Sequence, residues 1–105
     1  MSDEKLDAIG QILADDNGEL PVRIVIGQRG WVWVGRYAAT ADEVTLTGAK
    51  CIRRWGTTRG LAELCTTGPL TETKLDDGGT VRMHPLSVVG TLDCDAEKWR
   101  DALGG

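Results

Sequence analysis

An alternating pattern between residues 22 and 38, interrupted by one glycine-bounded turn, constrains the fold of this chain more than any other feature. Residues 22–27 are rich in β-branched side chains and favour a strand. Residues 27–30 have glycine at both ends, which is typical of a hairpin turn, and residues 31–38 form a second strand. The two-residue period of a strand puts on one face Trp31, Trp33, Gly35 and Tyr37, and on the other Val32, Val34 and Arg36.

Further short strands, each bounded by turn residues, are predicted after this hairpin. They cover residues 44–48, 49–55, 70–76, 80–84 and 86–92. The sequence Asp77-Gly78-Gly79 is a strong hairpin signal and predicts a tight turn between the strands on either side of it. Pro85 cannot donate a ladder hydrogen bond, so it separates the last two strands.

Three helical segments are expected around this sheet, over residues 3–14, 59–66 and 96–103. Their apolar faces hold, in that order, Leu6, Ile9, Ile12 and Leu13; Leu61, Leu64 and Cys65; and Trp99 and Leu103. Short strands joined by tight turns favour an architecture that protects its edges. The predicted fold class is therefore mainly β, a small SH3-like barrel or a strongly bent antiparallel sheet of about five to seven strands. An N-terminal helix, a short inserted helix and a C-terminal helical segment accompany it.

Charge is distributed unevenly along the 105 residues, whose net charge is −4. Residues 1–19 carry a net charge of −5, residues 20–60 carry +5 and residues 61–105 carry −4. We expect residues 1–19 to form an acidic helical arm and residues 20–105 a single small β domain. A basic middle between acidic ends suggests an anionic ligand or internal charge pairing. The overall acidity disfavours binding to long nucleic acids, because phosphate contacts dominate that affinity.

Several classes of function are disfavoured by the composition. No apolar run approaches the ~20 residues of a membrane helix, and the acidic N-terminus does not resemble a signal peptide. Cys51, Cys65 and Cys94 lack metal-ligand spacing and fit reduced thiols in the cytoplasm. The one histidine, His84, has no recognisable catalytic partner and is interpreted as a strand-end residue. We therefore expect no catalytic activity, no metal and no cofactor.

A series of short motifs lies between residues 22 and 97. In order they are Arg36-Tyr-Ala-Ala, Glu43-Val-Thr-Leu, Ala49-Lys-Cys-Ile-Arg-Arg-Trp-Gly, Leu61-Ala-Glu-Leu-Cys and Leu86-Ser-Val-Val-Gly. The series resembles a family of small uncharacterised bacteriophage and prophage proteins. The resemblance implies a phage origin, an accessory role and a non-enzymatic mode of action, and it transfers no activity.

The candidate binding residues lie in two aromatic and basic segments, 23–37 and 51–55. Together these segments hold three of the four tryptophans and five of the twelve Lys and Arg residues. An indole can stack on a base while a guanidinium holds a phosphate. The candidate ligand residues are Trp31, Trp33, Trp55, Arg53, Arg54 and Arg59. Because the chain has no Phe, the same tryptophans could instead fill the core.

We therefore predict a non-enzymatic, phage-type accessory protein that self-associates and captures a small anionic, nucleotide-like ligand, in order to counter host defence. The predicted self-association surface holds Arg36, Tyr37, Leu6 and Ile9. One alternative is a protein-binding inhibitor or structural phage component that uses the same Trp/Arg surface. Another is a single-stranded nucleic-acid binder, which the net acidity disfavours. The expected location is the host-cell cytoplasm, away from membranes.

Overall fold

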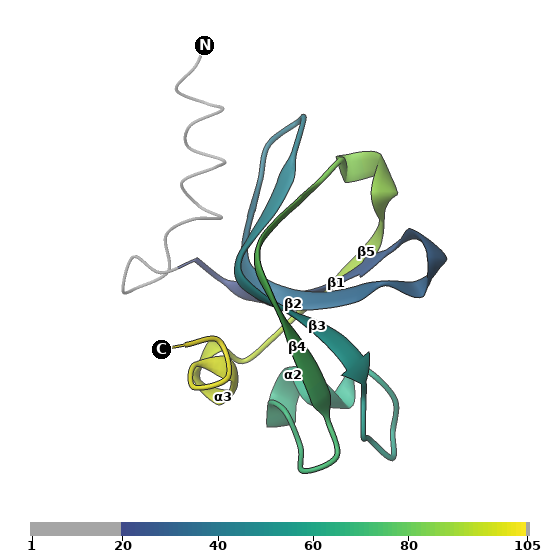
Figure 1. Cartoon of the computed structure of the whole chain (residues 1–105), viewed down its shortest axis with the longest axis vertical. Helices are drawn as coiled ribbons and strands as arrows, with labels where there is room; N and C mark the ends of the chain where they lie inside the picture. The colour runs from purple at the N-terminus through teal and green to yellow at the C-terminus, as the bar shows by residue number, and fades with distance from the viewer. Residues whose placement is uncertain (1–19, 105) are drawn as a thin grey trace.

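Strands make up most of the regular structure in the computed structural model, which describes residues 20–104. Five strands pair in one antiparallel sheet in the order β4-β3-β2-β1-β5 (Figure 1). They are β1 (Val22–Gly27), β2 (Val32–Ala39), β3 (Val44–Arg54), β4 (Lys74–Met83) and β5 (Val88–Asp93). The chain is therefore mainly β, as predicted. The predicted helix over 3–14 and acidic arm over 1–19, with Leu6 and Ile9, lie outside the described residues.

The β1–β2 hairpin forms where the sequence predicts it. The two strands pair from Val22 opposite Arg36 to Ile26 opposite Val32. The 3-10 turn η1 (Gln28–Gly30) joins them, and Arg29 within it has a φ of 65°. Residues other than Gly, Asn and Asp seldom adopt this region of positive φ. Arg29 adopts it at the tip of a tight turn, where its side chain is exposed.

The strand predictions after this hairpin are only partly right. Residues 70–73 of the predicted strand 70–76 lie before β4 and form no strand. Two further errors concern turns: residues 44–54 form the single strand β3 instead of two strands, and residues 77–79 lie inside β4 rather than in a hairpin turn. Gly48 and Gly79 explain both errors, because their φ angles are 61° and 68°. A positive φ suits a tight turn and a β-bulge equally well, so the same glycine can end a strand or bend it.

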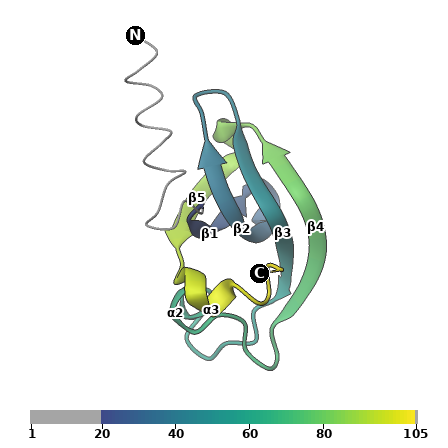
Figure 2. The ribbon, with the colours of Figure 1, turned by 90° about the vertical axis from the view of Figure 1, so that its left-hand side faces the viewer.

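The bulges change the face of the sheet on which a side chain lies. Leu46 and Ile52 are an even number of residues apart in β3, yet they pack in different hydrophobic cores. Their partners in β4, Val81 and Leu75, are divided in the same way. One extra residue reverses the alternation of a strand. Both strands therefore switch faces at the same level, where Figure 2 shows the sheet curving along β3 and β4.

The sheet has a hydrophobic core on each face. The first core, on the side of the helices, contains Val22, Ile24, Val32, Val34, Ile52, Leu61, Leu64, Cys65 and Trp99. The second core contains Val25, Tyr37, Val44, Leu46 and Ala49. The predicted alternation in β2 is confirmed, because Val32 and Val34 belong to the first core while Trp33 and Tyr37 contact the second.

Both helices predicted within residues 20–104 are present but short, as α2 (Glu63–Thr67) and α3 (Ala96–Trp99). The Asp95 carboxylate caps α3 by accepting a hydrogen bond from the Glu97 N–H at 3.1 Å. Trp99 is completely buried, and its Nε1 donates to the Leu64 carbonyl at 2.9 Å. This bond ties the two helices together over the first core. Within the described range, no helix has the length and apolar character needed to cross a membrane.

The link between β4 and β5 also follows the sequence. Pro85 begins the 3-10 turn η2 (Pro85–Ser87), which separates the two strands as predicted. His84 is exposed at the end of β4, and its Nδ1 accepts a hydrogen bond from the Leu86 N–H at 3.0 Å. The interpretation of His84 as a strand-end residue is therefore confirmed.

Candidate binding site

The four tryptophans differ widely in exposure. Trp99 is fully buried, whereas Trp31 is 56% exposed and Trp55 is 43% exposed. Trp33 is half-buried and packs against the second core. The core role expected from the lack of Phe therefore falls on Trp99 and partly on Trp33, and Trp31 and Trp55 present their rings to solvent.

Trp31 and Trp33 lie side by side at the start of β2. Their ring centroids are 5.9 Å apart and their planes differ by 12°. Gly78 of β4 lies directly against the Trp33 ring. A Cβ built at this glycine would lie only 2.8 Å from Cζ3 of the indole. Real Cβ atoms do not approach so closely, so the absent side chain of Gly78 is what allows Trp33 to take its place.

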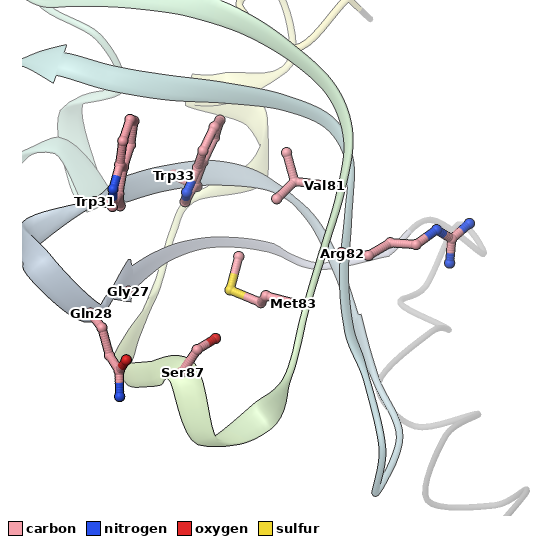
Figure 3. Close-up of a pocket in the computed structure, with 8 residues that line it drawn as sticks. All are labelled: Gly27, Gln28, Trp31, Trp33, Val81, Arg82, Met83 and Ser87. Carbon is pink, nitrogen blue, oxygen red and sulfur yellow. The ribbon is translucent and has the colours of Figure 1, made fainter.

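A cavity of about 390 Å³, here named the tryptophan cavity, opens beside this pair (Figure 3). It is lined by Gly27, Gln28, Trp31, Trp33, Val81, Arg82, Met83 and Ser87. Figure 3 shows the indoles, Val81 and Met83 gathered around the space while the Arg82 guanidinium points away from it. Arg82 instead pairs with Glu43 at 3.1 Å. The interior of the cavity is therefore aromatic and apolar.

The rim of the tryptophan cavity is formed by the two 3-10 turns. Gln28 of η1 and Ser87 of η2 supply its polar groups. The Gln28 side chain donates from Nε2 to the Leu86 carbonyl at 3.5 Å, a long hydrogen bond between the two turns. Leu86 itself is 82% exposed, so the turn η2 at the rim also presents an apolar side chain to solvent.

A second cavity of about 420 Å³, here named the arginine cavity, also reaches Trp31. Its lining residues are Gly30, Trp31, Val32, Cys51, Ile52, Arg53 and Asp76. Arg53 Nε lies 2.9 Å from Asp76 Oδ2, and both side chains are more than half exposed. An exposed ion pair contributes only about 0–1 kcal/mol, so another anion can compete for this arginine. Trp31 is common to both cavities.

The predicted ligand residues therefore do not form one cluster. The structure brings Trp31 together with Trp33 in one cavity and with Arg53 in the other. Arg54, Trp55 and Arg59 line neither cavity. The guanidinium of Arg54 is 3.9 Å from the Glu72 carboxylate, and the backbone N–H of Arg59 donates to Glu63 at 2.9 Å.

Pairing with acidic residues accounts for much of the basic middle of the chain. Among residues 20–104, the pairs formed by lysine and arginine include Lys50–Asp77, Arg53–Asp76, Arg54–Glu72, Arg82–Glu43 and Arg23–Asp93. Each pair joins residues that are distant from one another in the sequence. The charge pattern was consistent with an anionic ligand or with internal charge pairing, and the described residues show internal pairing.

The two predicted self-association residues in the described range, Tyr37 and Arg36, form contacts within the domain. Tyr37 is buried in the second core, and the Arg23 guanidinium lies 4.6 Å from the centre of its ring. Arg36 donates from Nη1 to the Leu20 carbonyl at 3.0 Å. These contacts anchor the start of β1 against β2.

Arg29 is a residue that sequence reasoning missed. It lies at the tip of η1, between Gln28 of the tryptophan cavity and Gly30 of the arginine cavity. Its side chain is exposed, and in residues 20–104 it has neither an ion pair nor a hydrogen bond. Its place in a predicted turn gave the only signal, because a turn tip projects its side chain beyond the sheet.

The three cysteines are free thiols. Burial raises the pKa of the Cys94 thiol above its ordinary value of 9.0, and the neighbouring Cys65 raises it further. Burial also raises the pKa of Cys51, with Asp76 adding to the effect and Arg53 opposing it. The Cys51 thiol in the arginine cavity is therefore neutral at pH 7.

Comparison with protein-family models, curated proteins and solved structures finds no match to this chain. The class of protein is therefore defined by fold and site alone. It is a small antiparallel β domain with an exposed, aromatic-lined cavity at the tip of its first hairpin.

Proposed function

We propose that this chain is a non-enzymatic binding protein that takes an apolar side chain of a protein partner into the tryptophan cavity. The stacked and solvent-accessible pair Trp31 and Trp33 carries this proposal. Val81 and Met83 complete an apolar lining into which no guanidinium points (Figure 3). Tryptophan and methionine are enriched in the cores of protein interfaces, and tryptophan dominates their hot spots.

The topology supports a binding role of this kind. We interpret the order β4-β3-β2-β1-β5, with a 3-10 turn between β4 and β5, as that of a small SH3-like barrel. Aromatic-lined grooves on small β domains of this type bind extended peptide segments. A fold alone does not assign a function, so the cavity remains the observation on which the proposal depends.

Selection of randomised peptides on the full chain tests this function. We expect the enriched peptides to share a large apolar residue and to lose binding to Trp33→Ala. The matched control is Trp55→Ala, since Trp55 is also exposed but lines neither cavity. The proposal fails if no peptide is enriched, or if the enriched peptides bind Trp33→Ala as tightly as the unchanged chain.

A second candidate function is capture of a small, nucleotide-like anion. The arginine cavity favours it, because Trp31 and Arg53 line the same space. A base would stack on Trp31 while a phosphate replaces Asp76 as the partner of Arg53. Isothermal titration with cyclic and linear nucleotides measures this binding, which Arg53→Gln is expected to weaken. Absence of heat with every nucleotide would remove the candidate.

The single-stranded nucleic-acid alternative has the least support. Such binders combine aromatic platforms with a continuous basic groove. Lys50, Arg53 and Arg54 lie within β3, but each is paired with a carboxylate. We therefore expect no oligonucleotide binding at low salt, measured by fluorescence anisotropy.

Phage origin, self-association and the host cytoplasm also remain proposals. The motif series between residues 22 and 97 supports the origin. Exposed Leu86 and Val89, at 82% and 70%, support self-association, because apolar surface of this kind favours contact with another protein. Sedimentation equilibrium of the full chain measures the subunit number, and a monomer at all concentrations would remove self-association.

A further inference from the structure

The position of Arg29 places a cation beside the site of the proposed function. The residue before it lines the tryptophan cavity, the residue after it lines the arginine cavity, and Trp31 lines both. A group bound against Trp31 therefore lies close to the tip of η1. The hydrogen bond of 2.7 Å from the Gly27 N–H to the Trp31 carbonyl closes the turn and fixes this arrangement.

The charges around Trp31 do not cancel. In the arginine cavity Arg53 and Asp76 neutralise each other, and the Cys51 thiol is uncharged at neutral pH because burial raises its pKa. Arg82, which lines the tryptophan cavity, is matched by Glu43. Arg29 is the remaining positive charge, on the turn whose other residues line the two cavities.

The backbone of Arg29 is a second observation that sets this residue apart. Its φ of 65° is the single positive value of a non-glycine residue within residues 20–104. Glycine or asparagine would fit the turn with less strain. Strained backbone positions of this kind cluster at active sites and ligand-binding sites.

We propose that the partner segment is acidic beside its apolar anchor. The apolar side chain enters the tryptophan cavity, and an Asp or Glu carboxylate of the same segment passes Trp31 and pairs with Arg29. A neutral or basic segment would leave the Arg29 charge without a partner or repel it. This inference rests on the proposed function, since it gives the chemistry of the partner that the tryptophan cavity binds.

The test repeats the peptide selection on three full-length proteins, the unchanged chain, Arg29→Glu and Arg100→Glu. Arg100 is the matched control because it is an exposed arginine at the end of α3 and lines neither cavity. We expect acidic residues beside the apolar anchor on the unchanged chain and on Arg100→Glu. On Arg29→Glu we expect basic residues in the same place. Thermal unfolding of each variant checks that it is folded.

A pair of peptides gives the magnitude. The best-enriched peptide and its version with Glu→Gln or Asp→Asn are titrated against the unchanged chain and Arg29→Gln. Removing either the peptide carboxylate or the Arg29 guanidinium is expected to weaken binding by about twofold to fivefold, as for an ion pair at the rim of an interface. Removing both should weaken binding no more than removing one of them. Raising the salt concentration should weaken only the combination that keeps both charges.

The outcomes separate this inference from the proposed function. Apolar peptides that need Trp33 but show no acidic preference overturn the inference and leave the function standing. An acidic preference that survives Arg29→Glu but disappears in Arg53→Gln also overturns it, by assigning the contact to the arginine cavity. Peptides that bind Trp33→Ala as tightly as the unchanged chain overturn the proposed function itself.

Discussion

The indole of Trp33 packs directly on the backbone of Gly78, with space for a hydrogen but none for a methyl group between them. Trp33 lies in a strand that the sequence predicts to carry the binding site, whereas Gly78 lies where the sequence predicts a turn. It places the edge strand β4 beneath the aromatic pair, where Val81 and Met83 of the same strand line the tryptophan cavity. The geometry of the cavity therefore depends on a residue that contributes no side chain.

Gly78→Ala is predicted to disturb the cavity without unfolding the domain. The added Cβ would lie 2.8 Å from Cζ3 of Trp33 and 3.3 Å from the Ala49 carbonyl oxygen, so the indole must move. Alanine suits a strand better than glycine by about 0.5–1 kcal/mol, which offsets part of the steric cost. We expect a changed near-UV circular dichroism signal and weaker peptide binding, with the unfolding free energy altered by about 1 kcal/mol or less.

Gly90→Ala is the control for this change. Gly90 lies in β5, and nothing lies within 4 Å of a Cβ built there. Its near-UV signal and peptide affinity should match those of the unchanged chain. Equal effects of the two substitutions would show that the contact between Gly78 and Trp33 does not shape the cavity.

Trp99→Ala is predicted to cost far more stability than Trp31→Ala. Trp99 is fully buried, so its removal should lower the unfolding free energy by about 3–5 kcal/mol. Trp31 is 56% exposed, and its removal should cost about 0.5 kcal/mol or less. Chemical denaturation measures both, and a Trp31 cost near that of Trp99 would mean that Trp31 belongs to the core.

Gly56→Ala is predicted to destabilise the domain more than Gly60→Ala. Both glycines have positive φ, 68° and 98°, so both substitutions carry the backbone penalty of about 1 kcal/mol or more. A Cβ at Gly56 would also lie 2.4 Å from the carbonyl carbon of Glu72, whereas one at Gly60 would meet nothing within 4 Å. The difference between the two melting temperatures isolates the steric contribution, and equal temperatures would contradict it.

Stability is predicted to fall as the pH rises above about 9, because the pKa of Cys94 is higher in the folded chain than its ordinary value of 9.0. Above pH 9 the unfolded chain releases this proton and the folded chain keeps it, so alkali favours unfolding. The slope from one such thiol is at most about 1.4 kcal/mol per pH unit. Urea denaturation between pH 7 and pH 10 measures it.

Cys94→Ala supplies the comparison for this pH dependence. Only the difference between the variant and the unchanged chain reports on the thiol, because every other contribution to the pH dependence is common to both. The variant should lose less stability between pH 7 and pH 10. Identical pH profiles would show that the Cys94 proton does not contribute.

The elements that local patterns encode were predicted well. Alternation and a glycine-bounded turn define the β1–β2 hairpin, and the spacing of Leu61, Leu64 and Cys65 defines the inward face of α2 and of the turn before it. The inward position of Trp99 in the last helical segment also follows from short-range signals. In each case the residues that specify the element lie within a few positions of one another.

The bulges and the cavity could not be predicted in the same way. Gly48 and Gly79 bend their strands because each strand has a neighbour that continues past the glycine, and that pairing is not encoded locally. The tryptophan cavity depends on Gly78, which is distant in sequence from Trp33. Arg29 became a candidate only when the other arginines near Trp31 were found with acidic partners.

The contact between Trp99 and Leu64 has a consequence for the order in which the domain is made. All five strands precede Trp99 in the chain, yet the first core is incomplete without this side chain. A nascent chain that has just finished β5 therefore still exposes the apolar surface that the indole will cover. The first core of this domain can therefore be completed only after synthesis has passed β5 and reached Trp99 of α3.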